Sequence, residues 1–311
     1  APDREAFTPE IASAYAKALK APPLQTPDAP RYAVWGGAYG GTNSTSGDPV
    51  GLGSHDTTSH TGAFAAGVDY RASADTVVGF ALAGGEASWS LAAGLGGGRS
   101  DVLQAGVYGW RQFGNAFLSG ALGYSSFWTT TNRTVTVAGT DQLTGALNPQ
   151  GFGGRFEGGY RANLMAADLI PYAALQAQSF FLPAYSETAA FGSPQFALAY
   201  TAQSATAVRS ELGSWAERSF RLADDTGLKL LGRLAWAHDW QSNPALGVTF
   251  LGLPGASFTV NGATPPSDLM LVTAGAEWRW RKDWALLGKL DGEFANGSQT
   301  YTGTVKLQHT W

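Results

Sequence analysis

The sequence predicts an all-β protein, a transmembrane antiparallel β-barrel of about twelve strands, from its last residues, its composition and its loop lengths. Residues 301–311 alternate without a break between two faces, because successive side chains of a strand point to opposite sides. One face carries Tyr301, Val305, Leu307, His309 and Trp311. A long two-faced strand that ends on an aromatic residue is typical of a closed barrel in the bacterial outer membrane, whose last strand pairs with its first. The alternative is an ordinary strand of a β-sandwich.

The composition favours a barrel wall with one face toward lipid and the other toward water. Only 14% of the 311 residues are charged, whereas soluble domains average about 25%. The mean hydropathy is nevertheless near neutral, at -0.10, and no run of about 18 apolar residues predicts a transmembrane helix. The chain contains 41 Gly, 11 Trp, 11 Tyr and 16 Phe. These features together suit membrane-spanning strands.

The same counts exclude several classes of function. The chain has no cysteine, so it has neither a disulfide framework nor a thiolate site. Its net charge of -4 gives no reason to expect nucleic-acid binding. No signal peptide opens the chain, and its first residues are interpreted as a mature start.

Residues 1–30 differ from the rest and predict a separate segment. Thr8 is a suitable N-cap, Pro9 fits the first helical position, and Glu10 suits the positive end of the helix dipole. Residues 11–20 are rich in alanine and predict a slim helix. Four prolines between residues 22 and 30 then predict a stiff linker. The expected organisation is a helix and linker over residues 1–30 and a barrel over residues 31–311.

From Arg31 onward the sequence predicts twelve strands in succession. They are expected at residues 32–42, 61–72, 76–91, 101–112, 116–130, 151–164, 169–182, 205–218, 226–240, 269–281, 284–294 and 301–311. The alternation also predicts which charged side chains face the lumen, namely Arg155, Glu157, Arg161, Lys229, Arg233, Glu277, Arg279, Lys289, Asp291 and Glu293. Inward charges of this kind line a watered pore, which we favour over an active site.

The connections between these strands alternate between long and short. Long connections are expected at residues 43–60, 92–100, 131–150, 183–204 and 241–268, and short ones at 73–75, 113–114, 165–168, 219–225 and 282–283. Only residues 295–300 break the pattern. Outer-membrane barrels have short periplasmic turns and longer extracellular loops, so both ends of the barrel are expected on the periplasmic side.

Aromatic residues gather near the ends of the predicted strands. Trp110, Trp240, Trp278, Trp280, Trp284 and Trp311 lie there, where girdles at the level of the lipid headgroups belong. Glycines relieve crowding where a closing sheet bends, and large side chains of neighbouring strands can lie over them.

Catalytic and metal-binding patterns are not found in the sequence. His55 and His60 lie in a Ser/Thr/Gly-rich segment without a third ligand, so we interpret them as solvated rather than as a metal site. The sequence has neither a nucleophile elbow nor a phosphate-binding loop. We therefore expect no enzymatic activity and no cofactor.

Several segments together resemble the C-terminal translocator domain of classical monomeric autotransporters, which belong to type V secretion in Gram-negative bacteria. Residues 234–240 (LAWAHDW) are similar to the Trp- and His-rich strand of this family, and residues 258–265 to the loop that follows it. Residues 210–213 (SELG), 292–294 (GEF) and 303–307 (GTVKL) also resemble family segments. The resemblance covers nearly the whole chain. Two departures are the terminal Trp311, where Phe is more frequent, and His309, where Tyr is common.

This resemblance implies a translocator in the outer membrane that exports a passenger attached at its N-terminus. It implies that a helix occupies the pore, here mapped to Thr8, Pro9, Glu10, Ile11, Ala14, Tyr15 and Ala18. It also implies that the terminal strand carries the signal for the barrel-assembly machinery, mapped to Tyr301, Val305, Leu307, His309 and Trp311. The expected partners are the passenger, that machinery and outer-membrane lipid, and we expect a monomer. Some family members cleave the passenger with an asparagine inside the barrel, but the first Asn here is Asn43, beyond the expected helix.

Three other readings stay open at this point. A small diffusion channel or porin would need residues 1–30 outside the pore. A membrane enzyme such as a barrel protease or lipase would need a catalytic group that the sequence does not show. A soluble β-sandwich that binds carbohydrate would purify without detergent.

Overall fold

The computed structural model describes residues 31–48, 50, 53–137, 139–164, 167–222, 226–241, 245–253, 255–261, 266–280 and 283–311. The predicted helix and linker of residues 1–30 lie outside the described residues. Among the described residues, helical structure is limited to two 3-10 turns, η2 (Ala92–Gly94) and η3 (Pro194–Phe196). No helix in this part of the chain is long and apolar enough to cross a membrane.

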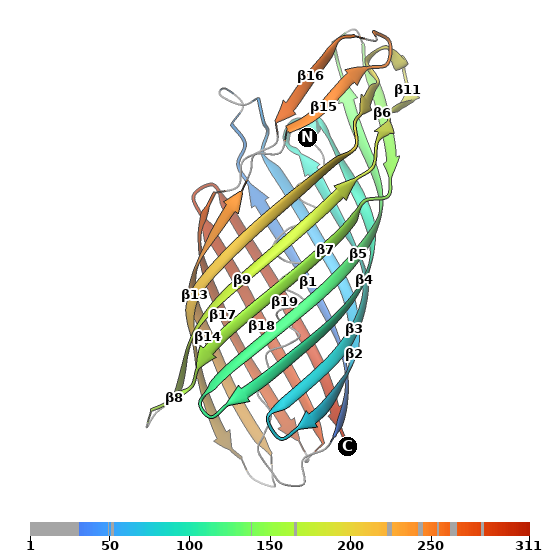
Figure 1. Ribbon diagram of the computed structural model, residues 1–311. Coiled ribbons are helices and arrows are strands. Elements are labelled where there is room, and N and C mark those ends of the chain that lie inside the picture. Colours follow the sequence, from blue (N-terminus) through green and yellow to red (C-terminus); the bar gives the residue numbers. More distant parts are fainter. Residues whose placement is uncertain are drawn as a thin grey trace.

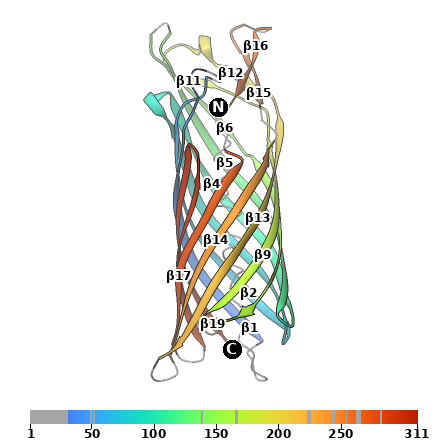
Figure 2. The same cartoon turned by 90° about the vertical axis from the view of Figure 1, so that its left-hand side faces the viewer.

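The described chain forms a closed antiparallel barrel of twelve strands (Figures 1 and 2). The wall strands are β1 (Tyr32–Thr45), β2 (Thr57–Ser73), β3 (Thr76–Leu91), β4 (Gly96–Phe113), β5 (Ala116–Val135), β7 (Gln150–Tyr160), β9 (Asp168–Leu182), β13 (Gln203–Arg221), β14 (Gly227–Gln241), β17 (Asp268–Trp280), β18 (Trp284–Ala295) and β19 (Ser298–Thr310). Closure comes from β1 and β19, which pair from Ala33 with Thr310 to Thr45 with Ser298. The predicted barrel is therefore confirmed, and its wall has no free edge.

Two expected loops and one expected strand differ from the structure in this part of the chain. The segment 92–100 was expected to be long, but β4 already begins at Gly96, because the glycines there pair with β3 and the Trp89 ring covers Gly98. The segment 131–150 was expected to be a loop, but β5 continues to Val135 and returns as β6 (Asp141–Leu147). After Tyr160 the sixth strand breaks, and a two-residue strand, β8 (Ala162–Asn163), completes it.

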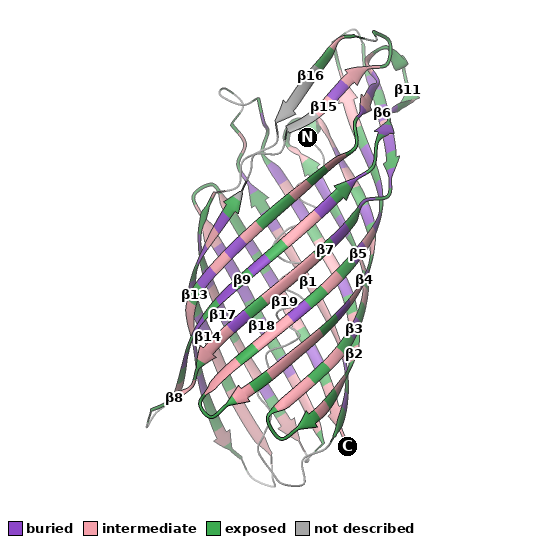
Figure 3. Ribbon diagram, viewed as in Figure 1, coloured by how far each residue is buried: buried purple, intermediate pink, exposed green. Residues whose placement is uncertain are grey.

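Along much of the wall, exposed side chains alternate with buried or partly buried ones, so the strands have two distinct faces (Figure 3). Large apolar side chains such as Phe64, Leu122, Leu234 and Leu290 are exposed on the outside. Tyr301 on β19 and Trp311, which directly follows that strand, are separated by ten residue steps. At about 3.3 Å per residue and a tilt of about 40°, that distance spans about 25 Å of membrane thickness. This is the height expected of the apolar band of an outer-membrane barrel.

Glycines allow aromatic rings to lie flat against the inner wall. A Cβ at Gly79 would collide with the Tyr108 ring, and one at Gly67 would collide with the Trp35 ring. The two rings are joined by a hydrogen bond from Trp35 Nε1 to Tyr108 Oη of 2.8 Å, and both contact the Asp69 carboxylate. The rings thus pack β1, β2, β3 and β4 together from the inside.

At the end of the barrel with the longer loops, a second small sheet forms, here called the loop sheet (Figure 1). It consists of β10 (Tyr185–Ser186), β12 (Leu198–Tyr200), β15 (Ala245–Phe250) and β16 (Ser257–Asn261). A further strand, β11 (Thr188–Phe191), pairs with β6. The loop sheet joins the connection after β9 to the one after β14, because β12 pairs with β15.

Candidate functional site: the charged inner wall

Closure of the barrel turns the polar faces of the strands inward. Residues that pair directly across two strands point to the same side, so the registers define one continuous inner face. Arg155 pairs with Gln176, which neighbours Arg209, and Arg209 pairs with Asp239. Contacts between strands that are not adjacent place these side chains inside the barrel.

Arg155 on β7 joins two carboxylates on this face. Its Nη1 lies 2.7 Å from Glu211 Oε1 on β13, and its Nη2 lies 2.8 Å from Glu157 Oε2. The bond to Glu211 passes over β9, which separates the two strands. Nη1 also donates to Gln176 Oε1 of β9, at 3.4 Å. The guanidinium and both carboxylates are nearly fully buried, so each charge depends on the others for solvation.

Arg233 on β14 connects the Arg155 group to the next strands. Its Nε donates to Thr273 Oγ1 at 3.1 Å, and its Nη2 lies 3.7 Å from Asp291 Oδ1. On the other side its Nη1 lies 3.8 Å from Glu211 Oε2. The guanidinium also lies 5.2 Å from the centroid of the Trp215 ring, a cation–π contact.

Arg209 on β13 makes an ionic connection to a strand that is not its neighbour. It binds both oxygens of Asp239 on β14, at 2.5 Å from Nε and 2.8 Å from Nη2. Its Nη1 donates to Glu293 Oε2 on β18 at 3.1 Å. Strands β14 and β17 lie between β13 and β18, so this contact spans four strands of the curved wall.

Toward the short-turn end, further charges pair in the same way. Arg161 contacts Asp168 at 2.7 Å and Glu217 at 3.0 Å, and Lys229 Nζ also lies 3.0 Å from Glu217. Arg279 donates to Glu277 through its Nε. Lys289, which was also predicted to face the lumen, is buried on β18.

On the opposite wall the polar contacts involve aromatic residues. Tyr108 Oη donates to Asp69, and Tyr39 Oη donates to Gln104 Oε1 at 3.4 Å. Lys306 of β19 lies 5.0 Å from the centroid of the Trp35 ring. The inner face therefore carries an ionic network on β7 to β18 and an aromatic and hydrogen-bonding group on β1 to β4.

The residues assigned to the assembly signal lie on the outer face of β19. Tyr301, Val305 and Trp311 are each about half exposed, at 49%, 55% and 56%. His309 stacks on Trp284 at 4.5 Å and lies 5.6 Å from Trp311, which in turn lies 6.4 Å from Tyr32. These rings form a row along the short-turn end of the barrel, at the seam between the first and last strands. The residues assigned to the pore helix lie outside the described residues.

The sequence did not single out two central members of the ionic network, Arg209 and Glu211. They could have been found from the period of two along β13, which places Arg209, Glu211, Trp215 and Glu217 on one face of the strand. Within the described residues, no group of three His, Asp or Glu side chains could hold a metal ion, and both His55 and His60 are exposed. The inner wall thus offers paired charges, hydrogen-bonding groups and ring faces.

Comparison with known proteins identifies the family of this barrel. The model of the family described as "Autotransporter beta-domain" matches residues 34–291. A search of curated proteins finds no match. Among solved structures, the translocator domain of the autotransporter NalP from Neisseria meningitidis is similar with a TM-score of 0.76 and 13% identity, over 97% of this chain and 94% of that one.

Two further autotransporter structures are similar. The beta domain of the Bordetella autotransporter BrkA has a TM-score of 0.68 and 16% identity, over 90% of this chain and 100% of that one. The transport unit of AIDA-I from Escherichia coli has a TM-score of 0.57 and 14% identity, over 98% of this chain and 100% of that one. At these identities the structures show the shared fold, whereas the family match covers most of the sequence. The chain therefore belongs to the autotransporter beta-domain family, and its barrel is an outer-membrane translocator.

Proposed function

We propose that this barrel exports a passenger attached at its N-terminus and that residues 1–30 then occupy the pore and plug it. The observation that carries the proposal is the inner wall, where an ionic network on one side faces an aromatic and hydrogen-bonding group on the other. Such a wall can hold a polypeptide by polar contacts on all sides.

The width of the pore supports a single polypeptide segment as its occupant. Twelve strands about 4.8 Å apart and tilted by about 40° close into a cylinder with a backbone radius of about 12 Å. Inward side chains fill the outer part of that radius. The remaining space suits about one α-helix, which is about 10–12 Å wide with its side chains. The helix predicted from Thr8 to Lys20 has the small alanine side chains that such a fit requires.

We further propose that the outer face of β19 is recognised during assembly. The row of His309, Trp311, Trp284 and Tyr32 rings marks the seam where the barrel closes. A factor that binds this exposed aromatic face can hold the last strand until it pairs with β1. Outer-membrane lipid surrounds the apolar band afterwards, and a single chain completes the barrel, so the proposed state is a monomer in a Gram-negative outer membrane.

Conductance in planar bilayers tests the plug. The full chain is expected to show small or rare openings. Removal of residues 1–30 is expected to leave the barrel folded, because the strands carry their own hydrogen bonds, and to produce a larger and more stable channel. Heat-shifted mobility on gels serves as the control that both proteins are folded.

Equal conductance of the two proteins would contradict the plug and favour the alternative function, a small diffusion channel. Export is tested separately, by fusing an epitope-tagged passenger upstream of residue 1 and measuring its exposure on intact cells. A folded barrel that leaves the epitope inside the cell would contradict the translocator function of this chain.

A further inference from the structure

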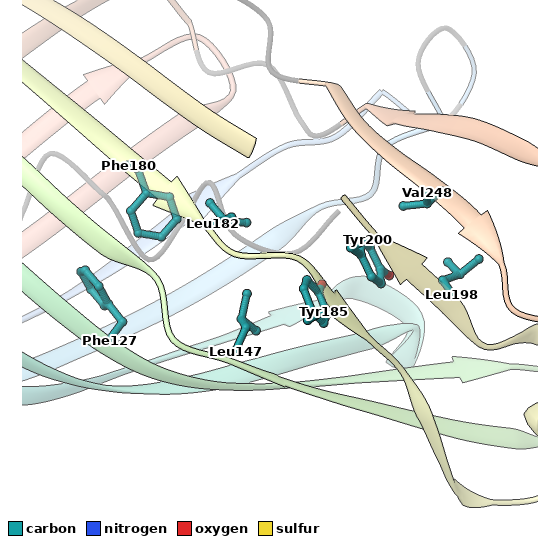
Figure 4. Packing of buried hydrophobic residues seen from close by; sticks show 8 residues of the cluster. All are labelled: Phe127, Leu147, Phe180, Leu182, Tyr185, Leu198, Tyr200 and Val248. Carbon is teal, nitrogen blue, oxygen red and sulfur yellow. The ribbon is translucent and has the colours of Figure 1, made fainter. Parts of the chain in front are cut away.

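The loop sheet packs against the inner face of the barrel wall at the long-loop end (Figure 4). One apolar cluster contains Phe127, Phe180 and Leu182 from the wall and Leu147 from β6. The other members, Tyr185, Leu198, Tyr200 and Val248, belong to the loop sheet. All eight residues are at most 9% exposed, and Phe127 and Val248 are essentially inaccessible.

The position of Phe127 and Phe180 decides where the loop sheet lies. On β5, Phe127 lies on the buried face together with Ser125 and Thr129, whereas Trp128 and Tyr124 face outward. On β9, Phe180 shares its face with Gln176, which belongs to the inner wall. The cluster is therefore inside the barrel rather than on its lipid side. Side chains of the loop sheet that join this cluster therefore lie on the pore side of β5 and β9 at this end of the barrel.

Aromatic stacking reinforces this contact. Tyr185 and Tyr200 lie parallel, with ring centroids 4.3 Å apart, and the Tyr185 ring occupies the space beside Gly145 of β6. Phe127 and Phe180 meet edge to face at 5.7 Å. The first pair joins β10 to β12 within the loop sheet, the second joins β5 to β9 within the wall, and the Tyr185 ring beside Gly145 connects the loop sheet to β6.

A partly buried ion pair also holds the loop sheet against the wall. The Glu187 carboxylate, 4% exposed, accepts two hydrogen bonds from Arg133 of β5, at 3.0 and 2.6 Å. It also accepts one from Tyr200 Oη at 3.1 Å and one from the Leu198 backbone at 3.0 Å. Burial lowers the pKa of Arg133, but the hydrogen bonds and charge of Glu187 outweigh that effect and raise it overall. The guanidinium thus stays charged and ties the loop sheet to the wall.

We propose that the loop sheet is a lid on the outer mouth of the pore, held shut by the apolar cluster and by Glu187 with Arg133. This lid lies at the long-loop end of the barrel, opposite the end where Tyr32 meets Trp311. The connections after β9 and after β14 supply its two halves, so parting the lid from the wall opens the mouth. The proposal rests on the proposed pore function, because a lid has a role only over a pore.

The absence of cysteine allows a direct test in the full chain. Ser125 lies on the inner face, two residues from Phe127, and is 5% exposed. Ser125→Cys provides a single thiol beneath the lid, and a membrane-impermeant maleimide added to intact cells reports access to it. Val248→Asp places a charge in the apolar cluster and opens the lid. The labelling rate is expected to rise by about tenfold or more, because labelling follows the population of the open state.

Two further variants complete the test. Leu253→Asp is the matched control, because Leu253 lies near the end of the same hairpin but is 62% exposed, and its labelling should equal that of the parent. Arg133→Gln releases Glu187 without changing the apolar cluster and should also accelerate labelling. If heat-shifted mobility on gels shows that Val248→Asp does not fold, Arg133→Gln is used in its place.

Folded variants that label no faster than the parent would overturn the lid, as would an equal increase with Leu253→Asp. Passenger exposure on the same cells is a separate measurement. If export fails while labelling behaves as expected, the proposed function is wrong and the lid stands.

Discussion

Replacing Arg209 by methionine should destabilise the barrel more than any exchange of a surface charge. Its guanidinium is 7% exposed and lies within 3.1 Å of both Asp239 and Glu293, which are themselves 10% and 6% exposed. Methionine fills a similar volume but leaves two buried carboxylates without their cation. Removing one partner of a buried ion pair costs about 3–5 kcal/mol, because the remaining charge is uncompensated. We expect a loss of this size in the free energy of unfolding.

The chain provides a matched control on the outside. Arg99 lies 2.6 Å from Glu86, but the two side chains are 65% and 61% exposed. An exposed pair contributes about 0–1 kcal/mol, so Arg99→Met should change stability little. Urea titrations of folding into liposomes measure both variants. A second test adds Asp239→Asn and Glu293→Gln to Arg209→Met, which should recover much of the loss because the repulsion is removed.

Equal destabilisation by Arg209→Met and Arg99→Met would refute this reasoning. It would show that water in the lumen screens the inner wall as well as bulk solvent screens the surface. The ionic network would then line the pore without stabilising the barrel.

Three other substitutions test the outer face, the inner wall and the terminal aromatic residue. Leu230 is 45% exposed on the outer face of β14, and Leu230→Arg should reduce the free energy of folding in liposomes by about 2–4 kcal/mol. Leu230→Ala should reduce it much less. Similar losses for the two variants would place this site outside the bilayer. Gly79→Ala should lose about 1–3 kcal/mol, because the Tyr108 ring is held by hydrogen bonds and cannot move aside, whereas Gly62→Ala has open space and should be neutral in thermal unfolding. Trp311→Ala should reduce the outer-membrane fraction with heat-shifted mobility, and wild-type levels would contradict a role of this ring in assembly.

The strands and their faces could be predicted because a barrel wall imposes a simple period. Each strand must present lipid on one side and the lumen on the other, so a one-residue error would reverse every side chain. This is why Arg155, Arg233 and Asp291 could be assigned to the polar face of their strands from sequence alone. The third strand was predicted with the bounds observed for β3, and the others differ by a few residues at their ends.

The loop sheet and the ionic partners could not be predicted, for a different reason. Strands such as β10 and β12 have two and three residues, which is too short for a period to be detected. β12 pairs with β15, which lies far along the chain, and β10 in turn pairs with β12. Likewise, the contact of Arg209 with Glu293 depends on the register of four strands and on the curvature of the closed wall.

The pairing of the first wall strand with the last has a kinetic consequence. Tyr32 and Trp311 exchange two backbone hydrogen bonds, of 3.3 and 3.0 Å, although nearly the whole chain separates them. Bringing such distant segments together from a disordered chain costs about 5 kcal/mol of loop-closure entropy. The hairpins between them lower that cost step by step, yet the final ladder can form only after every other strand is in register. Until then the growing sheet carries two unpaired edges, which can pair with other chains. We therefore expect the pairing of β1 with β19 to be the slowest step of folding and the one most prone to error.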